Sequence, residues 1–190
     1  MEEMCADLVV IGSGPSGQKG AVQAAKLGKK VIVLEKDPYP GGACLNSGTI
    51  PSKSLREAIL DLTDYYKRGF SDKSAMPKEV TINDLNDRLN RVLTEQRQII
   101  KRQFSKNQIE VIYGMATFVS PQEVEVADDS GKVVCRITGD FFLIATGSKP
   151  RNPGEVPFDN ERVLDSTRLL SIDHVPQSMT VLGGGIIGSE

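Results

Sequence analysis

The sequence has little of what several classes of protein require. Its 190 residues contain three cysteines, one histidine and no tryptophan. Cys5, Cys44 and Cys135 are too few for a disulfide framework, so we expect reduced thiols. Lysine and arginine (23) nearly balance aspartate and glutamate (25), which gives a formal net charge of −2. The sequence therefore indicates neither nucleic acid nor an acidic membrane surface as a partner.

Long apolar runs are also missing. No stretch approaches the roughly 20 apolar residues that a membrane-spanning helix needs. The chain begins with Met1-Glu2-Glu3-Met4, which is acidic where a secretory signal would be basic. We therefore expect a cytoplasmic protein with an ordinary globular composition, 39% hydrophobic and 25% charged.

The first 35 residues are typical of a strand–helix–strand unit. Apolar residues over 6–11 predict a buried strand, small residues over 15–27 predict a helix that Gly28 closes, and residues 31–34 predict a second strand. Glu35 ends that second strand. A strand, a turn, a helix and a strand within about 30 residues form a βαβ unit.

A glycine turn joins the first strand to the helix. Gly12-Ser13-Gly14-Pro15-Ser16-Gly17 matches the pattern G-x-G-x-x-G. Its glycines permit a tight turn, a close approach to a pyrophosphate and close packing of the helix, while an acid about 20 residues later accepts bonds from a ribose. With Glu35 in that place, the pattern predicts an α/β, Rossmann-like dinucleotide-binding domain with a mostly parallel sheet.

The rest of the chain adds helices and then short strands. The amphipathic helix has apolar residues at 85, 89, 92, 93, 99, 100 and 104, and we expect it to pack on the sheet. One predicted helix begins at residue 44 or 51 and ends at about residue 66, and a second spans 82–104, with a loop over 67–80 between them. The predicted strands are 109–113, 116–119, 123–126, 133–137, 140–145 and one that begins with residues 180–182. Residues 128–131 predict a hairpin turn within an additional antiparallel β-meander.

A second glycine turn lies near the end of the sequence. Gly183-Gly184-Gly185-Ile186-Ile187-Gly188 follows the apolar Val181-Leu182 and precedes Glu190. It is either a plain glycine-rich turn or the start of a second nucleotide site. We interpret residues 1–150 as the first part of one domain, residues 151–190 as a linker and the beginning of a second, and the chain as part of a longer protein.

One further stretch carries a family resemblance. Residues 41–53 read Gly-Gly-Ala-Cys-Leu-Asn-Ser-Gly-Thr-Ile-Pro-Ser-Lys. The stretch resembles the active-site segment of the pyridine nucleotide–disulfide oxidoreductases, G-G-x-C-x-x-x-x-C-x-P-S-K, as in dihydrolipoamide dehydrogenase. The resemblance includes both glycine turns and Ala145-Thr146-Gly147, and it implies FAD as cofactor and NAD(P)H as substrate.

Thr49 departs from the family pattern, because it stands where the family has its second redox cysteine. Threonine forms neither a disulfide nor a thiolate, which excludes the family's dithiol mechanism unless a thiol from outside this stretch takes part. Within the family, the stretch is most similar to the soluble, Si-specific NAD(P)+ transhydrogenases. This resemblance implies hydride transfer from NADPH to FAD and on to NAD+, in a full-length protein that is a homodimer.

The resemblance also implies site residues. Those implied in catalysis are Lys53, Thr49 and Cys44, with Cys44 either a vestigial packing residue or a reactive thiol. The residues implied in FAD binding are Gly12, Ser13, Gly14, Pro15, Ser16, Gly17, Glu35, Lys36, Gly42, Ala43, Cys44, Lys53, Gly114, Ala116, Ala145, Thr146, Gly147 and Ser148. Those for the nicotinamide dinucleotide are Gly183, Gly185, Ile186, Ile187, Gly188 and Glu190.

Other interpretations stay open at this point. The whole protein could be a dihydrolipoamide dehydrogenase-like or other disulfide reductase of the same family. It could also be a flavin-binding module without catalysis, and we expect little turnover from the first 190 residues alone. His174 lies in a polar segment and is expected at the surface, and no metal site is indicated.

Overall fold

The computed structural model describes residues 2–67 and 82–189, with the backbone alone for 62–67 and 84. The described residues form two compact units. Residues Met1–Asn46 and Glu95–Ser148 make the first, and residues Ser47–Thr94 and Lys149–Glu190 make the second. The loop predicted over 67–80 lies outside the described residues, except for Lys67, which ends a helix.

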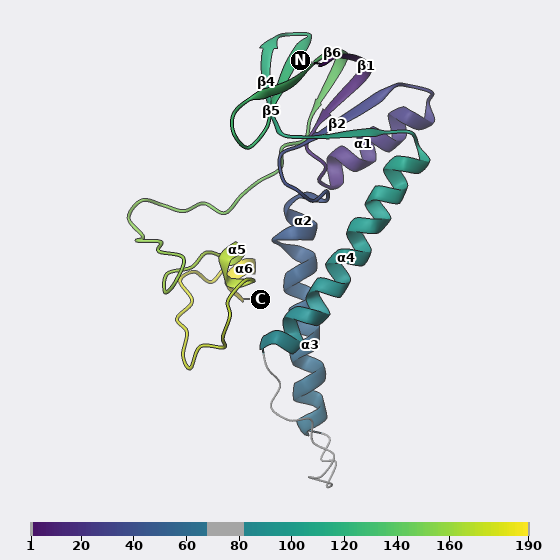
Figure 1. Cartoon of the computed structure of the whole chain (residues 1–190). Coiled ribbons are helices and arrows are strands. Elements are labelled where there is room, and N and C mark those ends of the chain that lie inside the picture. The colour runs from purple at the N-terminus through teal and green to yellow at the C-terminus, as the bar shows by residue number, and fades with distance from the viewer. Residues whose placement is uncertain (1, 68–81, 190) are drawn as a thin grey trace. The chain divides into compact units, whose positions relative to one another are not determined.

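The first unit is an α/β domain with one mixed sheet, as the sequence predicts. The strand order across the sheet is β3-β2-β1-β6-β5-β4 (Figure 1). Its elements are β1 (Glu2–Ile11), α1 (Pro15–Lys26), β2 (Val31–Glu35), α2 (Gly42–Asn46), the C-terminal part of α4 (Ile82–Lys106), β3 (Glu110–Tyr113), β4 (Met115–Ser120), β5 (Glu123–Ala127) and β6 (Val133–Ile144). Strands β3, β2, β1 and β6 run parallel, and β6, β5 and β4 form an antiparallel meander.

Strand β1 begins four residues earlier than the predicted strand over 6–11. Residues Glu2–Ala6 pair in parallel with Cys135–Gly139 of β6. The polar Glu2 and Glu3 carry no apolar pattern, so only their partner strand reveals that they are extended.

Strand β6 is one continuous element and not the two strands predicted over 133–137 and 140–145. Its first half pairs with β5 as well as β1, and its second half continues beside β1. Gly139 lies at the junction, where a Cβ atom would be 2.8 Å from Cγ2 of Val9 and 3.1 Å from Cζ of Phe142. In the sequence, a glycine at this position suggests that one strand ends and another begins. In the structure, Gly139 instead lets the continuous strand β6 pass close to its neighbours.

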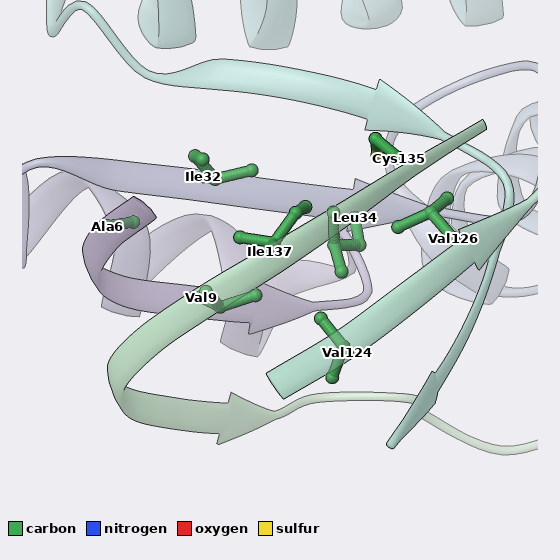
Figure 2. Packing of buried hydrophobic residues seen from close by; sticks show 8 residues of the cluster. All are labelled: Ala6, Val9, Ile32, Leu34, Val124, Val126, Cys135 and Ile137. Atoms are coloured by element: carbon green, nitrogen blue, oxygen red, sulfur yellow. The ribbon is translucent and has the colours of Figure 1, made fainter. Parts of the chain in front are cut away.

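The core of the first unit lies where the parallel and antiparallel parts of the sheet meet. Side chains from β1, β2, β5 and β6 interlock there (Figure 2). The cluster consists of Ala6, Val9, Ile32, Leu34, Val124, Val126, Cys135 and Ile137. Because β6 contributes to both parts of the sheet, one core holds the strand ends in place on both sides.

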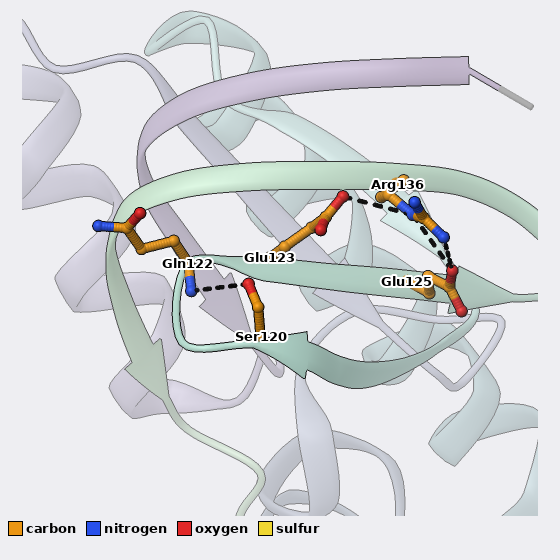
Figure 3. Close-up of polar contacts among 5 residues, drawn as sticks. All are labelled: Ser120, Gln122, Glu123, Glu125 and Arg136. Carbon is orange, nitrogen blue, oxygen red and sulfur yellow. Dashed lines mark hydrogen bonds and ion pairs between the residues drawn. The ribbon is translucent and has the colours of Figure 1, made fainter.

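Polar contacts align the meander. Arg136 of β6 lies opposite Glu125 of β5 and forms ion pairs with Glu125 and with Glu123, the latter at 3.3 Å between Nε and Oε1 (Figure 3). Opposite charges on facing positions of neighbouring strands favour this register of β5 against β6. The predicted hairpin turn is confirmed, because the Asp128 carboxylate accepts the backbone N–H of Ser130 (2.9 Å) and of Lys132 (3.1 Å).

The second unit is helical where it is regular. It contains α3 (Thr49–Lys67), the first part of α4, α5 (Ser166–Leu169) and α6 (Ile186–Ser189). Arg88 of α4 forms an ion pair with Asp61 of α3 at 2.9 Å. The strand expected from 180–182 does not form among the described residues, where these positions have no strand partner.

The amphipathic helix α4 confirms the predicted helix and extends it to Lys106. Leu89, Leu93, Ile100 and Phe104 are buried, as expected. Ile99 is 52% exposed and does not belong to the packed face. No helix in the described ranges is long and apolar enough to cross a membrane.

Two isoleucines of β6 test the importance of the core. Ile137 is fully buried and Ile144 is 66% exposed. We expect Ile137→Ala to lower the free energy of unfolding by about 2–5 kcal/mol, because it leaves a cavity. The matched variant Ile144→Ala should change it by no more than about 0.5 kcal/mol. Denaturant unfolding followed by circular dichroism measures both, and equal losses would contradict this core.

Candidate functional site

The parallel strands deliver the candidate residues to one edge of the sheet. Ile11 pairs with Leu34 of β2 and with Ile144 of β6, and Glu35 pairs with Tyr113 of β3. The carboxyl ends of all four strands therefore meet, which is where open α/β sheets bind their ligands. The first glycine turn, Glu35, Gly114 and the segment 145–148 each end or follow one of these strands.

The first glycine turn (Gly12–Gly17) has no room for side chains at its first and last positions. Gly12 has φ +103°, and a Cβ atom on it would lie 2.3 Å from the carbonyl oxygen of Ala145. A Cβ atom on Gly17 would lie 1.9 Å from the carbonyl oxygen of Gly12. The positive φ of Gly12 agrees with the tight turn expected there, and the contact at Gly17 agrees with close packing of the helix. The contact at Gly12 also shows that Ala145 lies next to the turn.

Helix α1 begins at this turn with its amide groups available to an anion. Its N-cap residue, Gly14, makes no side-chain capping bond, and the first turn of the helix contains no acidic residue. A Cβ atom on Gly14 would touch nothing closer than Cα of Gly42 at 3.9 Å. The turn thus leaves an open approach to the positive end of a 12-residue helix, which suits a phosphate.

Glu35 lies buried beside the turn and is held by hydrogen bonds. Its Oε2 accepts the backbone N–H of Ser13 at 2.9 Å and also the Ser13 hydroxyl. Its Oε1 accepts the backbone N–H of Asp37 at 3.0 Å. The N–H of Gly114 donates to the backbone carbonyl of Glu35 at 2.8 Å. Gly114, another of the predicted site residues, therefore lies next to Glu35.

The loop before α2 closes the other side of the turn. Gly41 (φ +121°) donates its N–H to the Ser13 hydroxyl at 3.1 Å. A Cβ atom on Gly42 (φ +61°) would lie 2.9 Å from Cα of Gly14, so the two glycines let the loop and the turn approach. Gly41 was not among the predicted site residues, although it opens the stretch that carries the family resemblance.

Sequence reasoning also missed two residues that hold this loop. The Asn46 amide donates to the carbonyl oxygens of Gly42 (3.2 Å) and Pro40 (3.4 Å). Asn46 Oδ1 accepts from Nε (3.0 Å) and Nη2 (2.8 Å) of Arg97, whose guanidinium lies 3.9 Å from the ring centre of Tyr39. No local signal marks Arg97, which is 51 residues away from Asn46 in the sequence.

The remaining predicted residues are placed less closely. Lys36 and Ala43 are exposed, as are Thr146, Gly147 and Ser148, whereas Ala116 is half-buried in β4. Cys44 is half-buried in α2 of the first unit, and Thr49 and Lys53 are exposed in α3 of the second. The catalytic roles of these three residues stay predictions.

Cys5 and Cys135 lie in the first halves of their strands, and His174 belongs to the second unit. Cys5 is exposed in β1, Cys135 is buried in β6, and both are free thiols. His174 is exposed as predicted, and its ring pairs with Asp173 at 2.6 Å. Across the described part of the chain, no three His, Cys, Asp or Glu side chains gather where they could hold a metal ion.

The second glycine turn has the same local geometry as the first. Gly183 has φ +114°. A Cβ atom on Gly188 would lie 2.1 Å from the carbonyl oxygen of Gly183, and the corresponding distance from Gly17 to Gly12 in the first turn is 1.9 Å. The N–H of Ser189 donates to the Gly185 carbonyl at 2.9 Å, as that of Gln18 does to Gly14. A short helical turn, Ile186–Ser189, follows the glycines.

A glycine substitution tests the close contact in the first turn. In Gly17→Ala, the new Cβ atom meets backbone that cannot rotate away, so we expect the free energy of unfolding to fall by about 1–3 kcal/mol. Gly154→Ala is the control, because nothing lies within 4 Å of its Cβ position. Denaturant midpoints measure both variants, and an unaffected Gly17→Ala would contradict the turn geometry.

Tyr113 reports on the charge of Glu35. Burial, with a smaller contribution from the Glu35 carboxylate, raises the Tyr113 pKa above 10.0. The neutral phenol therefore stabilises the fold below pH 10, and this contribution is lost as the pH rises through the Tyr113 pKa. We expect Glu35→Gln to lower the Tyr113 pKa part of the way towards 10.0, because only the charge is removed.

The measurement is the phenolate absorbance during alkaline titration, with Tyr113→Phe subtracted to isolate this residue. Circular dichroism at neutral pH first establishes that Glu35→Gln is folded. If Tyr113 had the same pKa in the wild type and in Glu35→Gln, the Glu35 carboxylate would not contribute to raising it.

Comparisons with known proteins agree with this arrangement. The model of the family described as pyridine nucleotide-disulphide oxidoreductase matches residues 6–190. The chain is 43% identical over 185 residues to proteins named soluble pyridine nucleotide transhydrogenase from Mycobacterium bovis and Mycobacterium tuberculosis, covering 97% of this chain and 40% of theirs. It is 35% identical over 184 residues to a protein of that name from Colwellia psychrerythraea.

A solved structure is similar as well. The HOCl-induced flavoprotein disulfide reductase RclA from Escherichia coli superposes with a TM-score of 0.77 at 28% identity, over 96% of this chain and 38% of that one. The chain thus spans about 40% of the length of the relatives it matches. With the glycine turn, the buried acid and the family match in agreement, the chain belongs to the pyridine nucleotide-disulphide oxidoreductase family.

Proposed function

We propose that the whole protein transfers hydride between NADPH and NAD+ through FAD, without a redox disulfide. Thr49 is the observation that carries this proposal, because it replaces a cysteine on which disulfide reduction depends. Neither remaining thiol lies in the same stretch, since Cys5 belongs to β1 and Cys135 is buried in β6. The relatives named soluble pyridine nucleotide transhydrogenase support the same activity.

The residues at the strand ends fit FAD. A pyrophosphate needs amide donors and positive potential, which the start of α1 supplies with no side-chain cap and no acidic residue in its first turn. The glycine positions leave no side chain between the backbone and such a ligand. A ribose needs an acceptor at the end of the second strand, and the Glu35 carboxylate is there.

Each part of the first unit then has a role in the proposal. The first glycine turn binds the pyrophosphate, Glu35 and Lys36 bind the ribose, and Gly114 and Ala116 border the adenine side. The segments of this unit proposed to lie along the flavin are Gly42 to Cys44 and Ala145 to Ser148. FAD, when bound, would supply the hydride-transfer chemistry, and the protein supplies position and charge. The family resemblance implies Lys53, which belongs to the second unit, as a cation for the reduced flavin.

The second glycine turn is proposed as the start of the nicotinamide dinucleotide site. Its geometry repeats that of the first turn, including the 2.1 Å approach that makes glycine necessary at position 188. In the proposal, Gly183, Gly185, Ile186, Ile187, Gly188 and Glu190 belong to this site. Two sites of one design in one protein suit two nucleotides that exchange a hydride.

A cysteine substitution in the whole protein tests the mechanism. We expect Cys44→Ser to keep NADPH-dependent reduction of an NAD+ analogue close to the wild-type rate, because no thiol takes part. Cys5→Ser, at an exposed position of β1, is the matched control. Stopped-flow reduction of the flavin by NADPH and steady-state turnover provide the two readouts.

Two results would contradict the proposal. Reduction of lipoamide at a rate comparable with transhydrogenation would make the protein a disulfide reductase, with Cys44 as a working thiol. Tight flavin binding without any turnover in the whole protein would make it a flavin-binding module.

A further inference from the structure

Two polar side chains are buried together at the first glycine turn. Ser13 and Glu35 are the polar or charged side chains that the structure buries among residues 2–61, 82–83 and 85–189. They come from the turn after β1 and from the end of β2. The motif allows many residue types at the position between its first two glycines. The motif alone therefore does not explain why a serine hydroxyl is buried there.

The Ser13 hydroxyl is fixed from both sides. It donates to Oε2 of Glu35 and accepts the N–H of Gly41 at 3.1 Å. A buried hydroxyl whose donor and acceptor are both used does not rotate without leaving a polar group unpaired. The chain of bonds from Gly41 through Ser13 to Glu35 therefore holds one carboxylate oxygen in place.

Hydrogen bonds within the protein then occupy most of the acceptor positions of the Glu35 carboxylate. A carboxylate offers about four acceptor positions, two on each oxygen. Oε2 accepts both the backbone N–H and the hydroxyl of Ser13, and Oε1 accepts the N–H of Asp37 at 3.0 Å. One acceptor position is left, on Oε1.

We propose that Ser13 determines how Glu35 recognises a ribose: by saturating Oε2, it limits the carboxylate to one hydroxyl of the vicinal diol, bound through Oε1. This inference rests on the proposed binding of FAD at the first glycine turn. One hydroxyl of the adenosine ribose then contributes strongly to affinity, and the other contributes little. Without the Ser13 hydroxyl, Oε2 gains a position and both hydroxyls contribute.

Two FAD analogues test the inference, one lacking the 2′-hydroxyl and one lacking the 3′-hydroxyl of the adenosine ribose. Their dissociation constants are measured by flavin fluorescence on the whole protein freed of its flavin. In the wild type, we expect one analogue to bind roughly tenfold or more weakly than FAD, as for a lost bond to a charged group, and the other to bind nearly as well. In Ser13→Ala, both analogues should bind more weakly than FAD.

The controls separate stability from recognition. Ser105→Ala, at an exposed position of α4, should behave as the wild type with both analogues. Melting temperatures establish that Ser13→Ala is folded. If that variant does not fold, equal losses from the two analogues in the wild type would still overturn the inference.

The outcomes distinguish the inference from the function on which it rests. Equal losses from both analogues in the wild type, with FAD itself bound tightly, would overturn the role of Ser13 and leave the flavoprotein intact. A whole protein that binds no FAD would overturn both. Unequal losses in the wild type that become equal in Ser13→Ala would support both.

Discussion

Parallel pairing on both sides of β1 brings the carboxyl ends of β2, β1 and β6 to one edge of the sheet. Everything proposed for the first unit depends on that alignment. The turn after β1 meets the acid at the end of β2 and the backbone of Ala145 after β6, each within bonding or contact distance. A shift of one residue in either pairing would turn these groups to other faces and separate them.

The two glycine turns show how much of this geometry is local. Both have a first glycine in the left-handed region and a last glycine pressed against the carbonyl of the first. The strand that supports the first turn is paired on both sides, whereas residues 180–182 are not part of a strand in the described chain. The turn thus forms from its own sequence, but a binding site also needs the neighbouring strands that bring an acid and a second backbone segment to it.

The chemistry of the proposed reaction follows from one side chain, and its recognition follows from several. Thr49 removes the second thiol of the motif, which a dithiol mechanism within this stretch requires. Recognition depends instead on a buried network in which Ser13, Glu35 and Gly41 share their hydrogen bonds. Asn46 and Arg97 hold the loop of Gly41 from outside, so residues far apart in sequence contribute to one carboxylate.

The sequence by itself determined the features that need only neighbouring residues. The βαβ unit, the glycine turn, the acid at the end of β2, the hairpin at Asp128 and the family were all predicted. These features were predictable because periodicity, positive φ and motif spacing are local properties of the chain.

The tertiary structure decided the rest, because strand pairing and buried hydrogen bonds join residues whose separation in sequence carries no signal. Only the partner strand shows that β1 begins at Glu2 and that β6 passes unbroken through Gly139. For the same reason, the bond from the Ser13 hydroxyl to Glu35, 22 residues away, and the contact of Arg97 with Asn46, 51 residues away, became visible only once the chain was folded.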